Sequence, residues 1–159
     1  MSEQQQPTGQ STKPSIKAKV LAARLRAVQA LYQKMQNKQP TRVVIKEYLE
    51  FRAEMDVDGE PLIPPDEDLF KKILFGVDER MTELESLVDA NLKKDSPNKE
   101  VEPLMRAILL CGTYEILIHE TDFPIIINDY LNVGHAFYER NQVALINGVL
   151  DNIANLFKK

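Results

Sequence analysis

Apolar residues recur at helical spacing along most of the chain. Between residues 15 and 38 they step by four and three positions, which places them in one stripe along a helix. Alanines in the same segment raise its helix propensity, and Pro40 cannot continue the helix. The stripe consists of Leu21, Leu25, Val28, Tyr32 and Met35.

Turn-forming residues divide the next part of the pattern. Thr41 can act as the N-cap of a second helix that runs to about Glu54. Residues 56–65 are rich in Pro and Gly and predict a loop. A long helical pattern follows from Asp66 to about Lys93, and Gly76 can divide it into two helices.

Three more helices are predicted toward the C-terminus. Pro103 fits the first turn of a nearly continuous apolar helix to Ile118, whose composition indicates a central, buried position. Pro124 opens the next helix, and Asn141 can cap the last one. No segment shows two-residue alternation, so we predict an all-α bundle of about seven helices.

Length and composition fit one intracellular domain. Residues 1–15 are rich in Gln, Ser, Thr, Pro and Gly and predict a disordered tail, whereas residues 16–159 are expected to share one core. The chain lacks an apolar stretch long enough to span a membrane, and its first residues do not resemble a signal peptide. Its single cysteine, Cys111, cannot form an internal disulfide. We therefore expect a cytoplasmic protein.

Charge is distributed unevenly along the chain. The net charge is −4, yet residues 1–38 alone sum to +6, which leaves −10 for the remainder. A basic N-terminal arm on an acidic body can attract phosphate groups locally. A solvated tail beside an ordinary helix would have the same composition, so charge alone leaves both interpretations open.

Residues suited to catalysis do not form a recognisable motif. The chain has no glycine-rich phosphate loop, CxxC, HExxH or GxSxG sequence. His119 and His135 lie sixteen residues apart, which does not make a metal site without further ligands. Cys111 lies in an apolar helix and is expected to be an inert core thiol. The sequence predicts a binding protein without metal or cofactor, not an enzyme.

The predicted first helix offers a candidate RNA-binding surface. Lys19, Arg26 and Gln33 recur every seven residues and therefore share one face. The residues that flank this face are Arg24, Gln29 and Tyr32. Basic side chains can hold phosphates, glutamine can hydrogen-bond bases, and tyrosine can stack on an unpaired base. The alternative is a solvated helix face with Tyr32 in the core.

Three sequence strings together resemble the NusB family of bacterial transcription antitermination factors. They are RLRAVQALYQ at residues 24–33, LMRAILLCGTYEI at residues 104–116 and INGVLD at residues 146–151. The resemblance covers about residues 17–157. The strings ARLRAVQALYQ and YLNVGHAFY together most resemble the sequences of members from alphaproteobacteria.

The resemblance implies a fold and a function. The family fold has two helical subdomains of about seven helices in one bundle, with the first helix exposed. Its members pair with NusE, a ribosomal protein of the small subunit, and bind the boxA element of single-stranded nascent RNA. The complex helps RNA polymerase to read through terminators, notably in ribosomal RNA operons, without a cofactor, and some members form homodimers. The alternative is a helical protein-interaction adaptor with weakened RNA recognition.

The resemblance also implies site residues. RNA-binding residues carried over from the first-helix motif are Lys17, Lys19, Arg24, Gln29 and Tyr32. Partner-binding residues carried over in the same way are Tyr32, Phe137, Asn141 and Leu145. Residues 20–23 are uncharged where many members have arginines, Asn141 replaces an acid and Leu145 replaces an aromatic residue. The thinner basic patch predicts weaker RNA binding by the protein alone, with more of the affinity supplied through the partner.

Overall fold

The computed structural model describes residues 15–50, 56–57, 60–61, 63–95 and 101–158. These residues form seven α-helices and one short hairpin, which confirms the predicted all-α class. The predicted tail lies outside the described residues apart from Ser15, which is structured as the N-cap of α1. The elements are α1 (Ile16–Asn37), α2 (Thr41–Glu50), β1 (Asp56–Val57), β2 (Glu60–Pro61), α3 (Glu67–Glu79), α4 (Met81–Asp95), α5 (Pro103–Ile118), α6 (Phe123–His135) and α7 (Arg140–Phe157).

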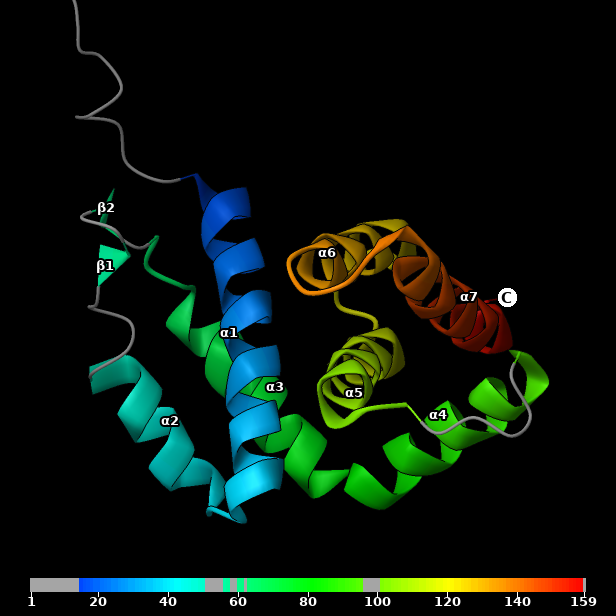
Figure 1. The fold of residues 1–159 in the computed structure, drawn as a ribbon, viewed down its shortest axis with the longest axis horizontal. Coiled ribbons are helices and arrows are strands. Elements are labelled where there is room, and N and C mark those ends of the chain that lie inside the picture. The colour runs from blue at the N-terminus through cyan, green and yellow to red at the C-terminus, as the bar shows by residue number, and fades with distance from the viewer. Residues whose placement is uncertain (1–14, 51–55, 58–59, 62, 96–100, 159) are drawn as a thin grey trace, which may run out of the picture.

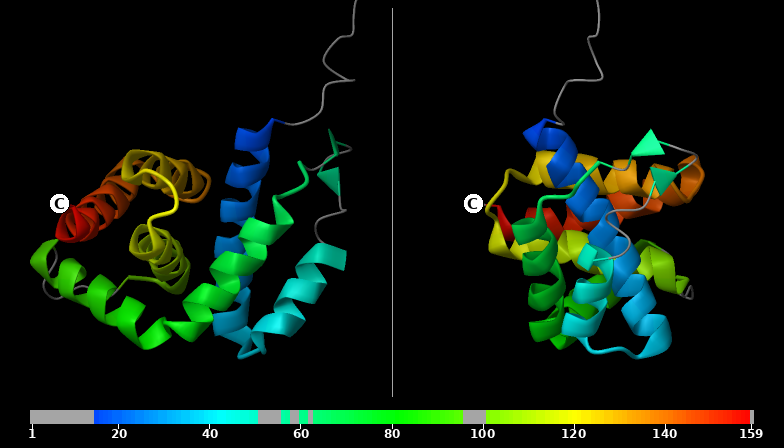
Figure 2. Two further views of the ribbon diagram at one scale, coloured as in Figure 1. Left: turned by 180° about the vertical axis from the view of Figure 1, so that it is seen from behind. Right: turned by 90° about the vertical axis from the view of Figure 1, so that its left-hand side faces the viewer.

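The helices form two subdomains that share one core. Helices α1, α2 and α3 and the hairpin lie on one side of the molecule, and α5, α6 and α7 lie on the other (Figure 1). Helix α4 continues from α3 along the edge of the bundle toward α7, as both figures of the whole fold show (Figure 2). Helix α1 packs against α3 within its own subdomain and against α5 and α6 of the other. Buried apolar side chains from all seven helices form one cluster, so α1 joins the two subdomains.

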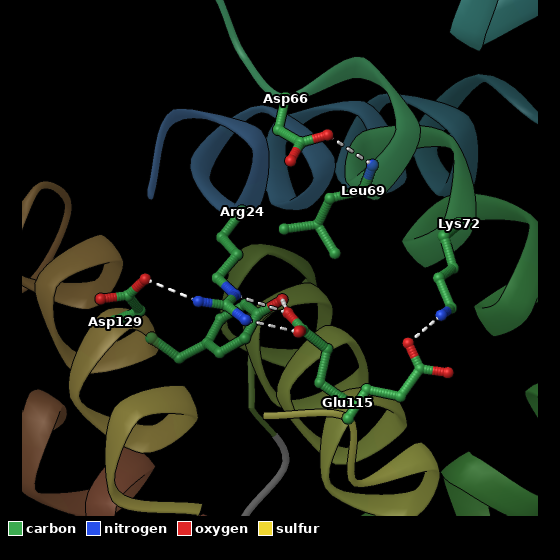
Figure 3. Close-up of polar contacts among 8 residues, drawn as sticks. Arg24, Asp66, Leu69, Lys72, Glu115 and Asp129 are labelled. Atoms are coloured by element: carbon green, nitrogen blue, oxygen red, sulfur yellow. Dashed lines mark hydrogen bonds and ion pairs between the residues drawn. The ribbon is translucent and has the colours of Figure 1, made fainter. Parts of the chain in front are cut away.

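Local hydrogen bonds set the ends of α1 and the start of α3. Ser15 Oγ accepts a hydrogen bond from the Ala18 N–H at 3.0 Å, which satisfies one free donor of the first turn of α1. Lys38 adopts a left-handed conformation with φ 55° and ends the helix. Asp66 Oδ1 accepts from the Leu69 N–H at 3.0 Å and caps α3 (Figure 3).

Two of the predicted helix caps are wrong. Thr41 is the first residue of α2 itself, and its buried Oγ1 has no hydrogen-bond partner among the described residues. Asn141 lies inside α7, whose N-cap is Glu139. The Gln142 side chain accepts from the Glu139 N–H at 2.9 Å and so holds this turn closed. Several polar residues stand near each helix start, and the pattern alone did not show which one caps.

The region between α2 and α4 corrects two further predictions. The loop predicted over residues 56–65 contains the hairpin, in which Asp56 pairs with Pro61 and Val57 with Glu60. Strands of two residues are too short to produce a visible alternation. Helices α3 and α4 meet at Arg80, whereas Gly76 lies inside α3. A Cβ at Gly76 would stand 2.0 Å from Cζ of Tyr114, so this glycine permits close packing of α3 on α5.

The described helices can also be compared with the dimensions of a lipid bilayer. None of these described helices combines the length and the apolar character that a membrane crossing requires.

Candidate functional site

Arg24 of α1 is buried between α5 and α6. Its Nε and Nη2 atoms donate to the two carboxylate oxygens of Glu115, each at 2.7 Å (Figure 3). Its Nη1 atom donates to Oδ2 of Asp129 at 2.7 Å. The structure argues against the predicted role of Arg24 in RNA binding, because a phosphate would have to displace two carboxylates from a side chain that is 2% exposed.

The groups around Arg24 stabilise one another. Burial by itself lowers the pKa of Arg24, but the hydrogen bonds and the charge of Glu115 outweigh it, and the pKa of the guanidinium is raised. Tyr130 donates its hydroxyl to Oε2 of Glu115 at 2.6 Å, and burial together with the Glu115 charge raises the pKa of this tyrosine well above its usual value. Arg24 stays charged and Tyr130 stays neutral near pH 7, so this cluster ties α1 to α5 and α6.

Polar side chains that recur every seven residues along α1 form hydrogen bonds mainly with other parts of the protein. Arg26 is buried, and its Nη2 atom donates to the carbonyl oxygen of Ile63 at 3.1 Å. Gln33 Nε2 donates to Oε1 of Glu47 on α2 at 2.6 Å. The structure therefore argues against Arg26 as part of an RNA surface, and Gln33 is tied to α2. Spacing identified a common face but not which neighbours would satisfy it.

Two predicted basic residues remain accessible near the start of α1. Lys17 is exposed and Lys19 is half-buried, and neither forms an ion pair within the part of the chain that the structure describes. Lys34 lies in the C-terminal half of α1, and its Nζ atom is 3.4 Å from Oδ1 of Asp78 on α3. Within α1, the lysines without a carboxylate partner among the described residues are thus the two near its N-terminal end, and the exposed Lys38 caps the other end.

A groove of about 450 Å³ lies beside the C-terminal half of α1, and we call it the Tyr32 groove. Tyr32 and Phe137, from opposite ends of the chain, both line it and are 37% and 38% exposed. Its amide-bearing lining residues are Gln29, Gln33, Gln36 and Asn37. The exposure of Tyr32 excludes the alternative that placed this residue in the core. The exposed rings can stack on a flat group, and the neighbouring amides can form hydrogen bonds with its edge.

The predicted partner-binding residues are only partly brought together. Tyr32 and Phe137 share one groove, whereas Asn141 and Leu145 do not line it. Asn141 is exposed and Leu145 is half-buried, and they lie four residues apart near the start of α7. Tyr138, which was not predicted, donates its hydroxyl to Glu102 at the start of α5. This contact fixes the α6–α7 turn that carries Phe137, and no periodic signal could have indicated it.

A second groove, of about 540 Å³, lies between the N-terminal halves of α1 and α6, and we call it the Lys17 groove. Helix α6 starts more than 100 residues after α1, and the Arg24–Asp129 contact holds the two together. Helical periodicity, which is local, could not have indicated this groove. The residues that line it include Ile16, Lys17 and Val20 from α1 and Ile125, Asn128 and Asp129 from α6.

The histidines and the cysteine have structural positions. His119 ends α5 in a left-handed conformation with φ 49°, and its ring stacks on Phe123 with centroids 4.1 Å apart. Cys111 is fully buried, and burial raises the pKa of its thiol well above the usual value, which agrees with an inert core thiol. Across the described residues, no three His, Cys, Asp or Glu side chains come together as a metal site would need.

Fold and site together define an all-helical binding protein, a two-subdomain bundle whose first helix borders two grooves. The NusB family model matches residues 21–155, and the chain belongs to the NusB family. The family prediction made from three short strings is therefore confirmed.

Individual relatives agree with this assignment. The transcription antitermination protein NusB of Nitrobacter hamburgensis is 35% identical over 139 residues, which cover 86% of each chain. That of Agrobacterium fabrum is 37% identical over 150 residues, which cover 92% of this chain and 90% of the relative. Both organisms are alphaproteobacteria, as the resemblance indicated.

Solved structures confirm the fold. T. maritima NusB aligns with a TM-score of 0.68 at 20% identity and covers 91% of this chain and 93% of its own. A chain in the crystal structure of the antitermination factors NusB and NusE in complex with dsRNA aligns with a TM-score of 0.70 at 18% identity. That alignment covers 86% of this chain and 96% of the other.

Proposed function

We propose that this protein is a transcription antitermination factor that binds boxA-type single-stranded RNA together with NusE. In that complex it supports read-through by RNA polymerase, notably in ribosomal RNA operons, and acts by binding alone. Family membership and the names of the relatives support the proposal. The observation that carries it is the meeting of Tyr32, from the AVQALYQ string, and Phe137, from the segment before INGVLD, in one groove.

The accessible residues of α1 suggest how RNA and partner divide the surface. Lys17 and Lys19 hold phosphates at one end of the helix, and Gln29 and Tyr32 contact bases or the partner nearer the other end. Lys17 and Tyr32 are about 22 Å apart along the helix axis, which is room for several nucleotides. Tyr32 and Phe137, with Asn141 and Leu145 nearby in sequence on α7, form the NusE side. Because Arg24 and Arg26 are buried, the lysines alone give weak affinity and NusE supplies further contacts.

Fluorescence anisotropy with a labelled boxA RNA and a scrambled RNA, with and without purified NusE, tests the proposal. We expect NusE to tighten binding to boxA more than binding to the scrambled sequence. Replacing Lys17 and Lys19 together with alanine should reduce the salt dependence, by about 0.7 in the slope of log K against log salt for each lost phosphate contact. Binding to NusE with no effect on RNA in any condition would contradict the proposal and indicate a protein adaptor.

Tyr32→Ala is expected to weaken NusE-assisted RNA binding by about 5- to 150-fold, because an exposed ring that stacks on a base contributes about 1–3 kcal/mol. Tyr32→Phe should retain most of the affinity, since it keeps the ring. Val43→Ala, which removes an exposed apolar side chain on α2, is the matched control and should bind normally. Normal binding by Tyr32→Ala, with an unchanged melting temperature, would remove the Tyr32 groove from the RNA and partner surface.

A further inference from the structure

The Lys17 groove has exposed apolar walls. Ile16 of α1 is 82% exposed and Ile125 of α6 is 52% exposed, and both line the groove together with half-buried Val20. Large aliphatic side chains this exposed gain most from a ligand that covers them. A nucleobase is flat, has two apolar faces and is far smaller than the groove, whose volume is about 540 Å³. The groove therefore has room for a planar ring whose faces cover these side chains.

A fixed hydrogen-bond acceptor lines the same groove. Oδ2 of Asp129 accepts from Nη1 of Arg24 at 2.7 Å, which holds the carboxylate in place. No hydrogen bond to Oδ1 of Asp129 occurs within the part of the chain that the structure describes, and the side chain is 19% exposed. Arg24 also pairs with Glu115, so the two carboxylates exceed the one guanidinium by one negative charge. A ligand edge that donates N–H groups to Asp129 is therefore favoured.

The charge at the groove favours a nucleotide over a basic peptide. Lys17 lines the groove, is exposed and has no carboxylate within ion-pair distance among the described residues. It can hold the phosphate next to an inserted base, and it would repel the arginine or lysine of a peptide that reached for Asp129. Lys17 thus suits the phosphate of one nucleotide, the apolar walls suit the faces of its base, and Asp129 suits the edge of the base.

We propose that the Lys17 groove is a subsite for one unpaired nucleotide of the bound RNA and that it prefers guanine. Guanine presents its N1–H and exocyclic amino donors side by side, whereas uracil presents one N–H between two carbonyls that Asp129 would repel. The amide of Asn128, which also lines the groove, can contact the remaining polar edge of the base. This subsite rests on the proposed function, because it operates only when RNA lies along α1.

The test uses the full chain with NusE and short uridine oligomers that carry one central guanosine, one inosine or no substitution. Inosine lacks only the exocyclic amino group, so wild-type protein should bind it about tenfold more weakly than guanosine, as expected for a lost hydrogen bond to a charged acceptor. Asp129→Asn keeps an oxygen for Arg24 and replaces the free acceptor by a donor. This variant should bind the guanosine oligomer about tenfold more weakly and lose most of the discrimination.

Controls separate the subsite from the general function. Asp68→Asn, an exposed carboxylate on α3, should leave discrimination unchanged. Equal binding of all three oligomers by wild type, with NusE-dependent boxA binding intact, overturns the subsite alone, and absence of any RNA binding overturns both proposals. Weaker NusE binding by Asp129→Asn without RNA would make the groove a protein contact and also overturn the subsite. If Asp129→Asn melts early, the inosine series on wild type remains decisive.

Discussion

Replacing Arg24 by alanine is expected to lower the free energy of unfolding by about 3–5 kcal/mol, because it leaves a buried carboxylate without its cation. Glu115 is 4% exposed in its side chain and accepts two hydrogen bonds from Arg24. The substitution also releases Asp129 and so removes the bridge from α1 to α6. Urea denaturation followed by circular dichroism at pH 7 measures this loss.

The control for this prediction is another arginine that has no buried partner. Arg42 is exposed on α2, and Arg42→Ala should change the free energy of unfolding by no more than about 0.5 kcal/mol. Arg24→Lys should lie between wild type and alanine, since lysine restores the charge but not the paired donors to Glu115. A loss below about 1 kcal/mol for Arg24→Ala would show that water solvates these carboxylates and that the cluster does not hold α1 in place.

The contrast between Arg24 and the helix that carries it shows what the sequence could predict. The apolar stripe from Leu21 to Met35 and the terminator Pro40 are local signals, and α1 forms over nearly the predicted residues. The partners of Arg24 lie 91 and 105 positions away, so no window of the sequence indicates that this arginine faces inward. The same limit explains Arg26, whose partner is a backbone carbonyl of the segment before α3.

The two grooves also differ in how far the sequence could predict them. Family strings located Tyr32 and Phe137, which the fold then places in one groove. The Lys17 groove depends on how α6 packs against α1, and the uncharged residues 20–23 gave no reason to expect a site there. Polar periodicity on a helix identifies which side chains share a face. Only packing decides whether that face meets solvent, a partner or the rest of the same chain.

Leu150→Asp is expected to abolish stable folding. Leu150 on α7 is fully buried, and its two methyl groups lie so close to α5 that a Cβ added at Gly112 would be 3.0 Å from each. Losing the leucine side chain alone costs about 2–5 kcal/mol, and an unpaired carboxylate in this position adds several more. The sum is comparable to the whole stability of a typical domain, about 5–15 kcal/mol.

Leu156→Asp is the matched control, because it makes the same substitution on the same helix at a leucine that is 58% exposed. It should keep the wild-type melting temperature within a few degrees, whereas Leu150→Asp should lack a cooperative thermal transition at neutral pH. Since α7 packs on α5, which carries Glu115, and on α6, which carries Asp129, loss of this contact also removes the support for the Arg24 cluster and both grooves. A cooperative transition in Leu150→Asp would mean that the α5–α7 contact can open to water, and that the two subdomains do not depend on one shared core.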